Sequence, residues 1–382
     1  MLTLIAKNIG QGNGASLSAL DVLVSLGQID PKMELIYLYK QKIPKIVDGK
    51  SVLYSKSYLS PRTFNEGGPL SLKKISNMII EPLLLKRLHK VSPKMVFINS
   101  MGSHTLWLPI KKKYNWPSTL IIRESPQLYQ KKNLPLVLDR FNYYNYVIFV
   151  SDIVKQKWLD LINIDRNKCF YIPNCIREKK VEHILKKSKL YFKKKIYKNP
   201  EKFIAICIGE VKFRKGQDLL INNLKLICDS IPNFKLIILG RQNKEFLKNI
   251  QTSLKNMNLE YIVEFITHKP NALEHIYAAD LLIQPSRSEA LPRTILEAMA
   301  LKTPIIASDV DGIPELVKHE KSAFLFSLTN ISQMIVGINK IYSDVLFKKN
   351  IVEGANKTYW SKFSRQIHIN NYANFIKNII DE

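Results

Sequence analysis

One pattern recurs in both halves of the chain: a short, continuously apolar run of strand length, followed by a segment of helix length. Continuous apolarity, rather than alternation, is typical of parallel strands that are buried on both faces. Repeated strand–helix units of this kind predict an α/β fold with two doubly wound parallel sheets. The runs are LTLIA, ELIYLY, MVFINS, TLIIRES and YVIFVS in the first half, and FIAICIG, KLIILG, IVEFIT, LLIQPS, PIIAS and AFLFS in the second.

The length of the chain favours two domains. At 382 residues it exceeds what one hydrophobic core usually supports, and a hydrophobic content of 46% is enough for two cores. The boundary is expected after YIPNC, where a lysine-rich segment begins. We predict a Rossmann-like N-terminal domain over residues 1–176, a Rossmann-like C-terminal domain over 177–358, and helices over 359–382 that pack back on the N-terminal domain.

The formal net charge of +26 favours polyanionic partners such as nucleic acid, anionic lipid or phosphorylated substrates. A compositional bias toward Lys, Ile and Asn is the competing explanation. Two lysine clusters stand out: Lys111–Lys113, and the run from Lys186 to Lys198, in which apolar and aromatic residues are interleaved. This run is compatible with a solvated helix, a nucleic-acid surface or an amphipathic membrane contact.

Cysteine and histidine usage argues against a disulfide framework or a zinc site. No C-x-x-C occurs, and the 7 histidines show no metal-ligand spacing. The chain start does not resemble a signal peptide, and no apolar stretch is long enough to span a membrane. We expect a cytoplasmic protein, soluble or peripheral on the inner face of the membrane. The cysteines are Cys169, Cys175, Cys207 and Cys228.

Ligands of open parallel sheets bind beyond the carboxyl ends of the strands, so the residues that follow each strand are the first candidates for a binding site. FIAICIG is followed by EVKFRKGQDLL, which places Gly209, Arg214, Lys215 and Gly216 between a strand and a helix. A glycine allows close backbone approach, and cations at a helix start favour phosphate. The alternative is an ordinary turn with two solvated cations.

LLIQPS is followed by SEALPRTILEAMA, which contains a second candidate anion site. Pro292 suits the start of a helix, where the amides near Leu291 and Arg293 would face a ligand. Glu289 lies at the strand end, and Glu297 lies more than a turn into the helix. A carboxylate at such a position can accept the paired hydroxyls of a sugar or ribose. The alternative for Glu297 is an ion pair with Arg293 on a solvated face.

Two further features are weaker signals. Gly10, Gly12 and Gly14 follow the first strand in a pattern that differs from the dinucleotide fingerprint, and predict either a loop that approaches a ligand or a simple turn. Asp309 and Asp311 form D-x-D, which is a candidate cation site; we favour the interpretation that one of them caps the following turn.

Several of these stretches resemble the retaining glycosyltransferases of family 4, which have the GT-B fold. The similarity is strongest in PSRSEALPRTILEAMALKTPIIASDVDGIPELV and extends to CIGEVKFRKGQDLLI, FVSDIVKQKW, CFYIPNC and GQGNGASLSAL. It implies a sugar-nucleotide donor held by the C-terminal domain and an acceptor held by the N-terminal one, with no metal and no enzyme nucleophile.

The resemblance also implies roles for individual residues. Glu289 would contact the transferred sugar, Glu297 the donor ribose, and Arg214 with Lys215 the pyrophosphate. The sequence departs from the family pattern at Glu210, where an arginine is common, at Ala290, where a glycine is usual, at Ala323, and at Arg123-Glu124-Ser125, where many members have a histidine. The expected donor-binding set is Gly14, Gly209, Arg214, Lys215, Glu289, Ala290, Leu291 and Glu297.

The expected catalytic set is Glu289, Arg214, Lys215 and Glu124, the last as a substitute for the missing histidine. His104 is another candidate, although a structural role is favoured for it. The resulting hypothesis is a retaining hexosyltransferase that builds a polysaccharide or glycolipid, with lysine clusters that contact an anionic membrane. Two alternatives stay open. One is a basic nucleic-acid-binding protein, although the sequence has no helix-turn-helix, RRM, KH or zinc pattern. The other is a catalytically silent GT-B scaffold.

Overall fold

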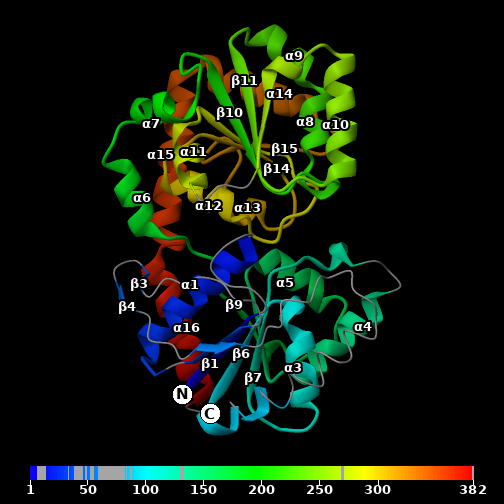
Figure 1. The fold of residues 1–382 in the computed structure, drawn as a ribbon, viewed down its shortest axis with the longest axis vertical. Coiled ribbons are helices and arrows are strands. Elements are labelled where there is room, and N and C mark those ends of the chain that lie inside the picture. Colours follow the sequence, from blue (N-terminus) through cyan, green and yellow to red (C-terminus); the bar gives the residue numbers. More distant parts are fainter. Residues whose placement is uncertain are drawn as a thin grey trace. The chain divides into compact units, whose positions relative to one another are not determined.

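The computed structural model describes residues 1–6, 14–32, 34–37, 46–47, 50–51, 56–58, 82, 84–86, 88–129, 133–267 and 271–380. The chain divides into two compact units (Figure 1). Unit 1 comprises Met1–Cys175 and Arg365–Glu382, and unit 2 comprises Ile176–Ser364.

Unit 1 is built on a parallel sheet. Among the described residues its strand order is β5-β2-β1-β6-β7-β8-β9, and every pairing is parallel. Strands β1, β6 and β7 are buried at every position, as their continuous apolarity predicts. The strands are β1 (Leu2–Ala6), β2 (Glu34–Tyr37), β5 (Lys56–Tyr58), β6 (Met95–Asn99), β7 (Ser118–Ile122), β8 (Tyr146–Phe149) and β9 (Cys169–Tyr171).

Unit 1 also contains helices and a small antiparallel pair of strands. Its helices include α1 (Gly14–Ile29), α3 (His104–Lys111), α4 (Leu134–Asp139), α5 (Asp152–Leu159) and α16 (Arg365–Ile380), and β3 (Ile46–Val47) pairs with β4 (Lys50–Ser51). Ser151 caps α5, because its side chain accepts from the amide of Val154.

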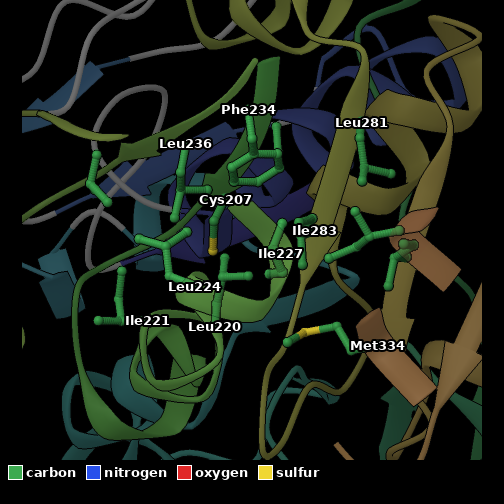
Figure 2. Close-up of a cluster of buried hydrophobic side chains, with 14 of the residues drawn as sticks. Cys207, Leu220, Ile221, Leu224, Ile227, Phe234, Leu236, Leu281, Ile283 and Met334 are labelled. Carbon is green, nitrogen blue, oxygen red and sulfur yellow. The ribbon is translucent and has the colours of Figure 1, made fainter. Parts of the chain in front are cut away.

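Unit 2 contains a second parallel sheet, in the order β12-β11-β10-β13-β14-β15. Cys207, Leu236, Ile283 and Met334 belong to its buried core (Figure 2). The strands are β10 (Phe203–Ile208), β11 (Phe234–Leu239), β12 (Val263–Ile266), β13 (Leu281–Gln284), β14 (Ile305–Ser308) and β15 (Phe324–Phe326). The predicted pair of doubly wound sheets is thus confirmed.

The helices of unit 2 alternate with these strands along the chain. They are α6 (Glu178–Leu185), α7 (Lys189–Ile196), α8 (Gln217–Asn222), α9 (Leu224–Ser230), α10 (Lys244–Asn256), α11 (Ala272–Ala278), α12 (Arg293–Ala300), α13 (Ile313–Leu316), α14 (Ser332–Ser343) and α15 (Val345–Lys362).

The strand order of unit 2 locates its binding edge. From β10 the chain builds outward through β11 and β12, then returns to the other side of β10 with β13 and continues through β14 and β15. The direction of winding therefore reverses between β10 and β13. Ligands of open α/β sheets usually bind outside the carboxyl ends of the strands at such a point.

The C-terminal helices differ from the prediction. A helix was expected from residue 359, but α15 begins at Val345, after the cap Asp344, and ends at Lys362 in unit 2. Tyr359 is buried there, and its hydroxyl donates to Glu178 Oε1 at 3.0 Å. Of these two C-terminal helices, α16 belongs to unit 1, where Arg365 forms a buried ion pair with Asp21 at 2.7 Å.

Candidate functional site

The loop after β10 packs closely against the loop after β13. Gly216 ends the turn Phe213–Lys215 with a left-handed φ of 69°. A Cβ at this position would lie 1.8 Å from the carbonyl oxygen of Pro285. Only glycine permits this close approach, and it brings the two loops at the switch point into contact.

We expect Gly216→Ala to destabilise unit 2 severely, because alanine would combine left-handed strain with a backbone overlap. The expected loss is about 3 kcal/mol or more, or roughly 6–12 °C in melting temperature. Gly102→Ala is the control, since a Cβ there would meet only Ser100 Oγ, at 3.6 Å. Thermal unfolding of the two variants measures the difference; equal melting temperatures would contradict the packing described here.

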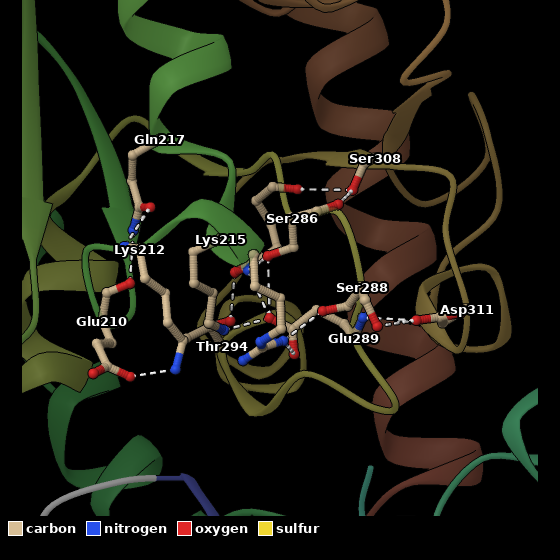
Figure 3. A network of polar contacts seen from close by, with 12 residues as sticks. Glu210, Lys212, Lys215, Gln217, Ser286, Ser288, Glu289, Thr294, Ser308 and Asp311 are labelled. Atoms are coloured by element: carbon tan, nitrogen blue, oxygen red, sulfur yellow. Dashed lines mark hydrogen bonds and ion pairs between the residues drawn. The ribbon is translucent and has the colours of Figure 1, made fainter. Parts of the chain in front are cut away.

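A cluster of two cations and one carboxylate lies between these loops (Figure 3). Lys215 Nζ donates to Glu289 Oε1, and Arg214 Nη1 lies 3.3 Å from Glu289 Oε2. Ser286 Oγ donates to the same Oε1 at 3.1 Å. The structure therefore brings Glu289 to the adjacent pair Arg214 and Lys215, which lies more than seventy positions earlier in the sequence, and all three were predicted to belong to the site.

Glu289 is charged despite its burial. Its side chain is about 10% exposed, and burial alone would raise its pKa, but Lys215 and Arg214 outweigh this effect and hold the pKa below its ordinary value. The cluster then carries two positive charges and one negative charge. This surplus of one positive charge suits an anionic ligand at the switch point.

Polar side chains behind Glu289 fix its carboxylate. Gln284 Nε2 donates to Ser286 Oγ at 2.7 Å, and Thr294 Oγ1 donates to Gln284 Oε1 at 2.8 Å. Ser308 Oγ in turn donates to the carbonyl oxygen of Ser286. These linked hydrogen bonds of Gln284, Ser286 and Thr294 support the position of the Glu289 carboxylate.

Asp309 or Asp311 was expected to cap the following turn, and the structure gives Asp311 contacts with the loop of Glu289. Helix α13 follows Gly312, and no side chain caps it. Asp311 Oδ2 instead accepts from Ser288 Oγ at 2.6 Å and from the Glu289 amide at 3.0 Å. Among the described residues, no three or more His, Cys, Asp or Glu side chains form a group that could hold a metal ion.

Arg287 joins the same two loops and was missed in the sequence. Its guanidinium makes two hydrogen bonds to Asp218, at 2.8 and 2.7 Å, and lies 3.8 Å above the ring of Phe213. Its amide donates to the carbonyl oxygen of Arg214 at 2.8 Å. No local pattern signals this contact, because its partners are about seventy residues apart in the chain.

Glu297 lies on α12, a helix whose residues are all buried except Thr294. Arg293 Nε lies 3.9 Å from Glu297 Oε1, and the two side chains are 8% and 12% exposed. The ion pair considered in the sequence therefore exists, but the solvated face assigned to it is wrong. Ala290 and Leu291, which precede this helix, are also buried.

Gly209 and Glu210 complete the loop after β10. A Cβ on Gly209 would lie 3.0 Å from Lys215 Cε, so this glycine leaves room for the lysine side chain. Glu210 forms an ion pair with Lys212, and both side chains are largely exposed. Glu210 therefore does not neutralise Arg214 or Lys215.

The remaining predicted residues lie in unit 1. Glu124 follows β7 and is half-buried: desolvation raises its pKa, and Trp158 Nε1 donates to its carbonyl oxygen at 2.8 Å. His104 is buried, and Tyr144 Oη lies 2.7 Å from its Nδ1. Burial and then Arg140 lower the pKa of His104 to about 4, so it is neutral at pH 7. Gly14 begins α1, whereas Gly10 and Gly12 lie outside the described residues.

Several lysines of the lysine-rich run form ion pairs or hydrogen bonds with other residues of unit 2. Lys193 pairs with Asp280 at 2.6 Å, Lys195 pairs with Glu274 at 3.0 Å, and Lys189 donates to the carbonyl oxygen of Ala279 at 2.7 Å. These contacts fasten α7 to α11 and the chain that follows it. No helix in the described part of the chain has the length and apolarity needed to cross a membrane.

Solved structures match this architecture over almost the whole chain. HepE of Anabaena, determined with UDP and glucose, has a TM-score of 0.80 at 17% identity and covers 98% of this chain and 99% of its own. Sucrose-phosphate synthase of Thermosynechococcus elongatus has a TM-score of 0.79 at 15% identity and covers 100% and 99%. The chain has the GT-B fold.

The second half of the sequence is similar to glycosyltransferases. Residues 188–358 match the model of the family Glycosyl transferases group 1. An uncharacterized glycosyltransferase of Methanocaldococcus jannaschii is 27% identical over 221 residues, which is 57% of this chain and 56% of the relative. N-acetyl-alpha-D-glucosaminyl L-malate synthase of Bacillus anthracis is 24% identical over 180 residues, 47% and 46% of the two chains. The chain spans about half the length of these curated relatives.

Proposed function

We propose that this protein is a retaining glycosyltransferase that moves a hexose-type sugar from a nucleotide-sugar donor to a glycan or lipid-linked acceptor without a metal ion. The observation that carries the proposal is the cluster of Arg214, Lys215 and Glu289 at the switch point of unit 2. The family match over residues 188–358 and the glycosyltransferase relatives support it.

The charges of the cluster suit this reaction. As the bond from the anomeric carbon to the donor phosphate breaks, its electron pair passes to the phosphate oxygen, and fixed cations stabilise the charge that develops there. Lys215 and Arg214 supply such cations. Glu289, held ionised beside them, accepts hydroxyl hydrogens of the sugar, and Glu297 takes the same role toward the donor ribose. Amides near Leu291 supply further donors to the diphosphate.

Glu124 is proposed to act on the acceptor side. Burial raises its pKa, and a carboxylate of raised pKa is a stronger proton acceptor than an exposed one. It would take up the proton that the acceptor hydroxyl loses.

The ligands of one structural neighbour suggest which donors to screen first. HepE was solved with UDP and with UDP-glucose. A screen of UDP-, GDP- and ADP-sugars by thermal unfolding, with EDTA present throughout, tests the proposal. At about 100 times the dissociation constant, the donor would stabilise the protein by about 2.7 kcal/mol, or roughly 5–10 °C. A panel in which no sugar nucleotide raises the melting temperature would refute the proposal; DNA or RNA binding in its place would favour the nucleic-acid alternative.

We also propose that the protein contacts an anionic membrane from the cytoplasmic side while it uses a lipid-linked acceptor. Lys186, which directly follows α6, and Lys194 on α7 are exposed, and so are Leu190 and Tyr191 of α7, at 55% and 44%. Cations around protruding apolar groups suit the surface of acidic lipid. Flotation with vesicles that contain phosphatidylserine tests the contact, and equal recovery with neutral vesicles would contradict it.

A further inference from the structure

Asp311 has an unfavourable backbone conformation beside the candidate site. Its φ is 44°, in the left-handed region that residues with a side chain rarely adopt. The residue is 7% exposed and is followed by Gly312 and α13. Strained backbone of this kind persists where the side chain gains contacts that the surrounding structure requires.

The contacts of Asp311 are with the loop that carries Glu289. Its Oδ2 accepts from the hydroxyl of Ser288 at 2.6 Å and from the amide of Glu289 at 3.0 Å, as Figure 3 shows. The amide of Gly312 donates to the carbonyl oxygen of Glu289 at 3.0 Å. The backbone of Glu289 is therefore held at both its amide and its carbonyl group by the short segment after β14.

The contacts of Asp311 and Gly312 with the Glu289 backbone control where the carboxylate of Glu289 lies. The carbonyl oxygen of Ser288 accepts a hydrogen bond from Arg214, and the carboxylate of Glu289 accepts one from Lys215. A shift of the backbone at Ser288 and Glu289 would therefore separate the carboxylate from both cations. Hydrogen bonds to a buried, charged acceptor are strong and directional, which suits the task of fixing one backbone position.

We propose that Asp311 is a positioning residue: it accepts strain in its own backbone to hold Glu289 at the place where the carboxylate meets Arg214, Lys215 and the sugar of the donor. Its effect on turnover rests on the proposed function, whereas its effect on the position of Glu289 does not. Asp309, the other acid of D-x-D, is exposed and has no such contact with this loop.

Two substitutions distinguish the effect of the Asp311 carboxylate from the effect of the Asp311 backbone conformation. Asp311→Gly removes the acceptor but adopts the same φ without strain, so the fold is retained. Asp311→Asn keeps one acceptor oxygen and adopts the left-handed region about as readily as aspartate does. We expect kcat/KM for the donor to fall about 30-fold in Asp311→Gly and to stay within about threefold of wild type in Asp311→Asn. Asp309→Gly, the matched control, should also stay within about threefold.

A double substitution decides whether Asp311 acts through Glu289. In a Glu289→Gln background, Asp311→Gly should have no more than about a twofold further effect on kcat/KM, because the group that it positions has already lost its charge. A purely structural role predicts the same 30-fold loss in both backgrounds together with a lower melting temperature. That result would overturn the proposal.

A crystal structure of Asp311→Gly gives a readout that needs no activity. The proposal predicts that the Glu289 carboxylate leaves Lys215 and that the Ser288–Glu289 backbone shifts, with the rest of unit 2 unchanged. An unmoved Glu289 would overturn the positioning role whether or not the wild type turns over a donor. A displaced Glu289 in a protein that turns over none of the sugar nucleotides would leave the positioning role standing and refute the proposed function.

Discussion

Glu289→Gln is expected to lower turnover of the sugar nucleotide by about 100-fold or more while nucleotide affinity stays the same or rises. Glutamine keeps the shape of the side chain but removes its charge. The positive surplus of the cluster then grows from one to two, because Arg214 and Lys215 lose the carboxylate that they share. An anionic nucleotide gains from that change, whereas the reacting sugar loses its charged partner.

Steady-state kinetics and calorimetry with the nucleoside diphosphate measure the two halves of this prediction. Glu320→Gln is the matched control, because Glu320 is a glutamate of the same unit that pairs with Lys340 on the surface. It should change neither quantity by more than about twofold. Turnover of Glu289→Gln within threefold of wild type would remove Glu289 from the reaction.

Lys215→Met is expected to weaken both binding and turnover. Methionine fills similar space but cannot neutralise the diphosphate, so affinity for the nucleoside diphosphate should fall about tenfold or more and turnover about 100-fold or more. Affinity for the uncharged nucleoside should not change. That contrast separates loss of a phosphate contact from general damage to the site.

The same substitution has a consequence for pH dependence. Lys215 is the larger of the two cationic influences that lower the pKa of Glu289, and burial opposes them. Without Lys215 the pKa of Glu289 rises, so the acid limb of the activity profile should move to higher pH in Lys215→Met. Lys340→Met, which alters a surface pair, should leave the acid limb in place. An unshifted acid limb in Lys215→Met would contradict the electrostatic account of Glu289.

The sheets and the meeting of the two loops could be predicted because they depend on local patterns. Buried parallel strands need continuous apolar runs, and parallel strands bring their carboxyl ends to one edge. Gly209, Arg214, Lys215 and Glu289 all follow strands β10 and β13, which are neighbours, so their proximity follows once the strand order is known.

The supporting contacts could not be predicted, because they join segments with no shared pattern. Asp311 reaches Ser288 across 23 positions of the chain, and Arg287 reaches Asp218 across 69. Helix α12, which carries the buried Glu297, packs against α15, α11 and α6, and the local periodicity of α12 does not indicate these contacts. The start of α15 did have a signal that was overlooked: Asp344 is a helix cap that accepts from the amide of Phe347 at 2.8 Å.

The central claim is a metal-independent transfer that retains anomeric configuration at the cluster of Arg214, Lys215 and Glu289. Its most direct test is to follow the wild-type protein by proton NMR in EDTA, with the α-linked sugar nucleotide that gives the largest thermal shift. The account predicts release of the nucleoside diphosphate, with the α-anomer as the first product of transfer or hydrolysis, and loss of this signal in Glu289→Gln. A β-anomer formed first, or a reaction that stops when EDTA is added, would contradict it.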